Sequence, residues 1–202
     1  MSWLSDASTT GSPEVKETFE KVAASRGWVS NLLRSLGHAP QALSRFAALG
    51  HYGRYGTELT ELQRELVIVI AGRKIPYAWA HHAPLARQVG VTAGQLDAIR
   101  NDRTPPDLPA PERALCDLVF ALAAMNGVSE DLRRGSLRHF SERQVTDVVL
   151  LTAYYLAAAS VIVGLDVRIE PADVLKIELQ WQLRPRDVAA GQVVSDAQPR
   201  PT

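Results

Sequence analysis

The sequence predicts an all-α protein, a compact bundle of several helices, and two observations support this fold class. First, helix-start signals recur along the 202 residues. Ser or Thr followed by Gln three residues later is a capping box, in which both side chains satisfy free backbone N–H groups. Second, apolar residues recur at the spacing of a helix face. The capping boxes are Thr60 with Gln63, Thr92 with Gln95, and Ser141 with Gln144.

Prolines mark three further helix starts, because the first helical turn does not need the N–H group that proline lacks. These are Pro13, Pro40 and Pro111. Glycines favour helix ends, and Gly90, Gly127 and Gly164 stand where helices are expected to stop. We therefore expect helices at about 13–25, 39–52, 60–74, 77–89, 93–101, 110–126, 129–138 and 142–163.

The C-terminal part has a different pattern, since apolar and polar residues alternate strictly from Leu175 to Leu183. This alternation is typical of a strand. We expect a short β-hairpin with residues 167–169, or an extended C-terminal arm, and a lone hairpin would need to lie against another surface. Residues 184–202 are rich in Pro, Gln, Asp and Gly, and we expect a disordered tail there.

The chain is predicted to form a single helical domain over residues 1–183. Its hydrophobic content of 46% is sufficient for one core. Within this domain, two halves at about 13–101 and 110–165 are joined by a segment, 101–111, that contains four prolines.

Composition excludes several classes of function. Lys and Arg balance Asp and Glu at 22 each, so no global basic field would bind nucleic acid. The N-terminus has neither a basic region nor an apolar run, which predicts a cytoplasmic protein without a secretory signal. Residues 148–165 carry no charge and approach the length of a membrane span. We nevertheless interpret them as a buried helix and expect no membrane association. The single cysteine, Cys116, forms neither an internal disulfide nor a zinc-type cluster.

The most informative stretch contains Arg64-Glu65-Leu66, then Tyr77-x-Trp79-x-x-His82, then Pro84-Leu85-Ala86-Arg87 with Gly90. At these residues the sequence resembles the carboxymuconolactone decarboxylase and alkylhydroperoxidase D-like superfamily. The resemblance extends over about residues 30–170 and includes the run from Phe140 to Val145 that leads to Tyr154 and Tyr155.

The resemblance implies a helical subunit that assembles as a homo-oligomer, a trimer or a hexamer, with a dimer as the alternative. Peroxidase-like members use a Cys-x-x-Cys pair, and here Ile75 and Ala78 occupy the two cysteine positions. The histidine position falls on His82, and Glu65 is implied as the proton-relay glutamate. Thiol peroxidase activity is therefore disfavoured, unless Cys116 proves exposed and acidic.

The residues themselves suggest a site on the helix expected at 77–89. Trp79 and His82 are three residues apart and share a face, and Tyr77 and His81 form a second edge. A histidine against an indole is partly desolvated, which favours its neutral form and suits proton transfer. The competing interpretations are that His82 is a structural histidine and that Glu65 is an exposed carboxylate in a first helical turn.

Two remaining features are weaker. His81 and His82 point about 100° apart on a helix, so they are not expected to bind one metal, and we predict no metal and no other cofactor. Tyr154 and Tyr155 are expected to be core or interface aromatics, and Tyr155 is a candidate for the pocket wall. The glycines at 50, 53 and 56 follow a predicted helix instead of a strand, so they are a poor phosphate loop.

These observations lead to one functional hypothesis and one alternative. The hypothesis is a cofactor-independent lyase or isomerase, decarboxylase-like, that transfers protons on a small organic acid, lactone or secondary metabolite. His82 and Glu65 would be catalytic, and Tyr77, Trp79, His81 and Tyr155 would bind the substrate. The alternative is a non-catalytic oligomer of the same fold that binds a small molecule or serves as an accessory subunit.

Overall fold

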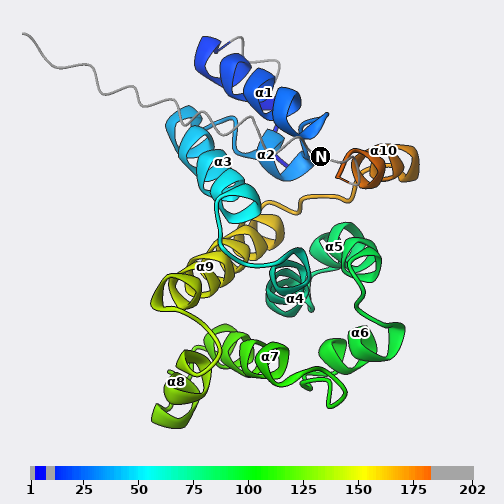
Figure 1. Cartoon of the computed structure of the whole chain (residues 1–202). Coiled ribbons are helices and arrows are strands. Elements are labelled where there is room, and N and C mark those ends of the chain that lie inside the picture. Colours follow the sequence, from blue (N-terminus) through cyan, green and yellow to red (C-terminus); the bar gives the residue numbers. More distant parts are fainter. Residues whose placement is uncertain (1–2, 8–11, 183–202) are drawn as a thin grey trace, which may run out of the picture.

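The computed structural model describes residues 3–7 and 12–182, which form ten α-helices and no strand. They are α1 (Pro13–Arg26), α2 (Asn31–Ser35), α3 (Pro40–Tyr55), α4 (Glu61–Gly72), α5 (Pro76–Gln88), α6 (Ala93–Arg100), α7 (Ala110–Ala123), α8 (Glu130–Leu137), α9 (Glu142–Gly164) and α10 (Ala172–Gln182). Helix α4 packs among α5, α6, α7 and α9, whereas α1, α2, α3 and α10 lie together at the top of Figure 1.

The helix starts expected from the sequence are confirmed. All three capping boxes form, at the N-termini of α4, α6 and α9. Pro13, Pro40 and Pro111 lie in the first turns of α1, α3 and α7. The short helix α2 was not expected, because its five residues are too few for a periodic pattern, although Ser30 caps it by accepting a hydrogen bond from the N–H of Leu33.

Helix α4 is the centre of the main apolar core because it is buried on all sides. Its residues from Glu65 to Gly72 are all buried, and it packs against α5, α7 and α9. A helix that is apolar all round belongs in a protein interior. Each fully buried Leu or Ile there, such as Leu66 and Ile70, contributes about 2 kcal/mol relative to an exposed side chain.

Close contact between α4 and α5 brings the candidate residues of both helices together. A Cβ atom at Gly72 would lie 2.7 Å from Cβ of Ala78, so only glycine permits this approach. Pro84 stands inside α5 and cannot donate to the carbonyl of the preceding turn. The two helices thus place Glu65 and His82 on facing sides of one tight crossing.

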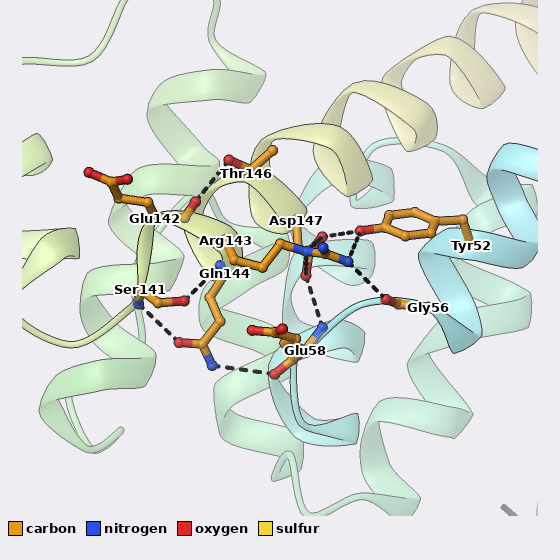
Figure 2. A network of polar contacts seen from close by, with 9 residues as sticks. All are labelled: Tyr52, Gly56, Glu58, Ser141, Glu142, Arg143, Gln144, Thr146 and Asp147. Carbon is orange, nitrogen blue, oxygen red and sulfur yellow. Dashed lines mark hydrogen bonds and ion pairs between the residues drawn. The ribbon is translucent and has the colours of Figure 1, made fainter. Parts of the chain in front are cut away.

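A polar network joins the turn between α3 and α4 to helix α9 (Figure 2). Asp147 is fully buried, and its carboxylate accepts hydrogen bonds from the Tyr52 hydroxyl, the backbone N–H of Glu58 and the Arg143 guanidinium. Arg143 also donates to the Tyr52 hydroxyl, at 2.7 Å. The network fixes the C-terminus of α3 and the start of α4 against α9.

The strand predicted near the C-terminus is wrong, because residues 172–182 form helix α10, which packs against α1 and α5. No sheet exists among the described residues for a strand to join, and a helix satisfies its backbone groups internally. The tail expected at 184–202 lies outside the described residues.

Helix α9 is the one described helix with the length and composition of a membrane span. This is weak evidence for a membrane protein, because the core helix of a soluble protein meets the same criteria. The helix packs against α3, α4 and α7, and it contributes Val148 and Leu151 to the main core.

Candidate functional site

The imidazole of His82 lies between a carboxylate and a phenol. His82 is buried on α5, and its Nδ1 atom lies 3.1 Å from Oε2 of Glu65, which is buried on α4. On the other side, Nε2 lies 3.3 Å from the hydroxyl of Tyr155 on α9. The Tyr155 ring stands edge-on to the imidazole, with centroids 5.2 Å apart. We call these three residues the Glu65–His82–Tyr155 row.

The charges in the row determine which of its atoms carry protons. Burial raises the pKa of Glu65, but the charge and hydrogen bond of His82, with help from Arg54 and Arg64, outweigh burial and hold it below its usual value. Glu65 is thus an anion at neutral pH. A carboxylate only accepts hydrogen bonds, so Nδ1 of His82 carries the donated proton.

The position of that proton determines the hydrogen bond at the other end of the row, between His82 and Tyr155. With Nδ1 protonated, Nε2 of a neutral His82 is an acceptor and faces the Tyr155 hydroxyl. Desolvation raises the pKa of Tyr155, so its hydroxyl remains protonated at neutral pH. The hydroxyl donates to Nε2 when His82 is neutral and accepts from Nε2 when His82 carries the charge that lowers the pKa of Glu65. Orientation of an imidazole by a buried carboxylate is the arrangement that prepares a general base in many hydrolases.

The neighbouring histidine belongs to a second buried cluster. Nε2 of His81 lies 2.7 Å from Oε2 of Glu170, a residue between α9 and α10. The other carboxylate oxygen accepts the Tyr77 hydroxyl at 2.7 Å and the backbone N–H of Asn31 at 2.6 Å. The ring of His81 stacks with that of Tyr77, with centroids 4.4 Å apart, and with that of Trp28, with centroids 6.0 Å apart.

Glu170 is an anion in this cluster. Burial raises its pKa, but the hydrogen bond and charge of His81, the N–H of Asn31 and the Tyr77 hydroxyl together lower it below its usual value. The cluster joins α5 to the start of α2 and to the segment before α10. These contacts hold the three segments together, which indicates a structural role for the cluster.

The residues proposed from the sequence therefore fall into separate places. Glu65, His82 and Tyr155 come together, whereas Tyr77 and His81 contact Glu170 on the second edge of α5. Trp79 does not supply the aromatic partner of His82, which is Tyr155, and instead lies under the Arg100 guanidinium, 5.0 Å away. The interpretation of Glu65 as an exposed carboxylate is wrong, because only 6% of it is accessible.

Sequence reasoning missed Glu170 and Asp147. No periodic pattern or motif identifies Glu170, because its partners are 89 and 139 residues away in the chain. Asp147 had one local signal, Arg143 four residues earlier on the same helix, which is the spacing of a helical ion pair.

Cys116 does not have the properties of a reactive thiol. Its side chain is fully buried on α7, and burial raises its pKa to about 12. A peroxidatic cysteine needs an accessible thiolate near neutral pH. Peroxide chemistry through Cys116 is thus disfavoured by its surroundings.

The described residues contain no group of three or more His, Cys, Asp or Glu side chains arranged to hold a metal ion. Two surface hollows lie over the N-terminal helices, one beside Pro40 and the other beside Phe19. Neither is lined by a member of the Glu65–His82–Tyr155 row.

Comparison with solved structures assigns the fold. A peroxidase-related protein from Silicibacter sp. superposes with a TM-score of 0.70 at 22% identity, covering 85% of this chain and 93% of the other. An alkylhydroperoxidase core protein, also peroxidase-related, from Ralstonia eutropha gives 0.67 at 19% identity, covering 86% and 92%. The debrominase Bmp8 gives 0.64 at 18% identity, covering 86% and 94%.

The chain therefore has the all-α fold of the alkylhydroperoxidase D-like proteins, as its resemblance to that superfamily predicted. A further similar structure is a cysteine-to-alanine variant of Bmp8 in complex with 2,3,4-tribromopyrrole. No protein-family model matches the chain, and no curated protein matches its sequence.

Proposed function

We propose that the protein is a cofactor-independent lyase or isomerase that moves protons on a small organic acid, lactone or related metabolite. The Glu65–His82–Tyr155 row is the observation that carries this proposal. It has an ionised carboxylate at one end, a protonated phenol at the other, and an imidazole between them. Such a row transfers a proton in either direction with little movement of heavy atoms.

In the proposed reaction His82 is the general acid or base. As a base, Nε2 takes a proton from a carbon beside a carbonyl group, directly or through the Tyr155 hydroxyl, and Glu65 stabilises the resulting imidazolium. Return of that proton to another carbon completes an isomerisation. In a decarboxylation, the C–C bond breaks, its electron pair forms an enolate, and protonated His82 supplies the proton to carbon. Burial of the row strengthens these electrostatic effects.

The test of this proposal has two stages, a screen for ligands and a measurement of proton exchange on the ligands that bind. A thermal-shift screen against lactones, enol acids and aromatic acids selects binders, because a ligand of the native state raises the melting temperature. Each binder is then incubated with the protein in D2O and followed by NMR for deuterium at carbon and for loss of carbon dioxide. We expect exchange or turnover by the parent protein for at least one binder.

Variants of the row show whether exchange depends on it. His82→Gln is expected to lower the rate by about a hundredfold or more, the usual range for a general acid or base. Tyr155→Phe is expected to lower kcat more than it raises KM. The control is His139→Gln, an exposed histidine, which should leave the rate unchanged. Unaltered exchange in His82→Gln would overturn the proposal.

The alternative, a non-catalytic binding or accessory protein, is favoured by one observation. His82 is only 7% accessible and lies against two side chains of its own protein, as a structural histidine would. Binders that neither exchange nor turn over in the parent protein would favour this alternative.

We also propose a cytoplasmic homo-oligomer, a trimer or hexamer, with a dimer as the alternative. Helix α9 exposes Val149, Leu150 and Val163, and these apolar side chains favour burial against a second copy. Light scattering coupled to size-exclusion chromatography measures the number of subunits, and a monomer at micromolar concentration would contradict this proposal.

A further inference from the structure

Two arginines from the N-terminal part of the chain lie near the tyrosines of α9. Arg26 is the last residue of α1, and Arg54 is in the last turn of α3. Helix α3 packs against both α1 and α9. Neither arginine is a member of the Glu65–His82–Tyr155 row.

Gly50 marks the point where Arg26 and Tyr154 converge. A Cβ atom at Gly50 would lie 2.3 Å from the Tyr154 hydroxyl and 3.3 Å from Nη2 of Arg26. Any larger residue would collide with the Tyr154 hydroxyl, which lies close against Gly50. The glycine therefore keeps a phenol and a guanidinium together at the surface of α3.

Tyr154 brings a polar group to this point without a partner for it. Its side chain is 7% accessible, and its ring packs against Phe46 and Tyr155, with centroids 4.6 Å and 5.3 Å away. None of the described residues forms a hydrogen bond with the Tyr154 hydroxyl. A buried phenol usually has such a bond, because an unsatisfied one is costly.

Arg26 also lacks a counterion in the described part of the chain, where no carboxylate lies within ion-pair distance of it. Its charge nevertheless affects the pKa of Tyr155, a member of the row. Burial raises the pKa values of Tyr154 and Tyr155, and both Arg26 and Arg54 oppose that rise. Arg54 also contributes to the lowered pKa of Glu65. The two cations thus lie in the electrostatic environment of the proposed reacting groups.

We propose that Arg26 and the Tyr154 hydroxyl form an anion-binding subsite that receives a carboxylate of the substrate. This inference rests on the proposed function, since Tyr154 contacts Tyr155 and Tyr155 contacts His82. Guanidinium groups suit carboxylates because their N–H groups match the two oxygens. The substrate class is therefore a small organic acid that binds as its anion, in preference to a neutral lactone or amide.

The experiment compares ligands that differ in charge but hardly in shape. The probes are benzoate with benzamide and propanoate with propanamide, titrated calorimetrically into the parent protein and its variants. We expect the parent protein to bind an acid more tightly than the matching amide. Arg26→Gln should weaken acid binding by roughly tenfold, the usual effect of losing a charged hydrogen bond. Binding of the amides should not change.

Two further variants control for folding and for overall charge. Arg26→Lys keeps the charge, and we expect it to retain part of the affinity that Arg26→Gln loses. Arg45→Gln removes an exposed arginine from the same helix as Arg54 and should change nothing, because Arg45 donates to the backbone of its own helix. Equal binding of acid and amide by the parent protein, or no binding of either, would overturn the subsite.

The two proposals fail in different ways. If Arg26→Gln weakens benzoate binding but the parent protein exchanges no proton on any acid, the subsite stands and the proton-transfer proposal fails. If acids bind as tightly to Arg26→Gln as to the parent protein while His82→Gln abolishes exchange, the subsite is overturned and proton transfer stands.

Discussion

Glu170 and His81 form a buried pair in which Oε2 and Nε2 are 2.7 Å apart, across 89 residues of sequence. The same carboxylate accepts the Tyr77 hydroxyl and the N–H of Asn31. One side chain from the segment before α10 thus holds α5 and the start of α2 together. We therefore expect removal of this side chain to lower the stability of the protein more than it lowers the proposed activity.

Replacing Glu170 with Gln is expected to lower the free energy of unfolding by about 3 kcal/mol at neutral pH, since it breaks a buried pair. The folded-state pKa of Glu170 lies below the ordinary value of 4.5. Its contribution is therefore complete above that pH and is lost as pH falls toward the folded pKa. Urea unfolding at neutral and acidic pH should show the difference between parent protein and variant shrinking in acid.

The control for that experiment is Glu20→Gln, which removes an exposed carboxylate from α1. We expect it to change stability by less than about 0.5 kcal/mol. A Glu170→Gln effect of equal size at both pH values would contradict the assignment of an ionised Glu170.

Asp147→Asn is expected to destabilise the protein by about 3 kcal/mol, because an amide would present N–H groups to donors that need acceptors. Those donors are the Tyr52 hydroxyl and the Glu58 N–H (Figure 2). Arg143→Gln should cost less than about 1 kcal/mol, because Arg143 is exposed and Asp147 keeps its other partners. Thermal or urea unfolding measures both, and a reversed order would contradict the account of the network.

Gly72→Ala is expected to lower stability by about 2 kcal/mol, since the new methyl group would meet Cβ of Ala78 and push α4 and α5 apart. The matched control is Gly94→Ala in α6, where nothing lies within 4 Å. That change should be neutral or stabilising by up to about 1 kcal/mol through helix propensity. Equal melting temperatures for the two variants would show that the helix crossing tolerates separation.

Cys116 should resist iodoacetamide in the folded protein and react fully in urea, because burial raises its pKa to about 12. Mass spectrometry measures the modified fraction over time. Rapid modification at neutral pH under native conditions would restore a thiol-based mechanism as a candidate.

The fold was predictable to the extent that its signals are local. Capping boxes and first-turn prolines define helix starts through neighbouring residues, so the starts of α4, α6 and α9 were confirmed. The short α2 carries too few residues for a pattern. Alternation in α10 was ambiguous, because Leu175 and Leu179 satisfy a four-residue helical spacing as well as a strand period.

The site was predictable only in part, for the same physical reason. A family motif pointed to Glu65 and His82, which do meet, and neighbouring positions on α5 pointed to Tyr77 and His81. Spacing on one helix could not show that Tyr155 would be the ring beside His82, or that Glu170 and Arg26 would come from the ends of other segments. Those contacts depend on how helices pack, which no single stretch of sequence records.

The two histidine pairs of α5 should form at different stages of folding. The contact between Glu65 and His82 closes a loop of 17 residues, whereas that between His81 and Glu170 closes one of 89. Closing a longer loop costs more chain entropy, and contacts distant in sequence form more slowly. We expect a chain emerging from the ribosome to form the Glu65–His82 contact while Glu170 has not yet been synthesised. One contact of the proposed site would thus precede the cluster that joins α5 to α2.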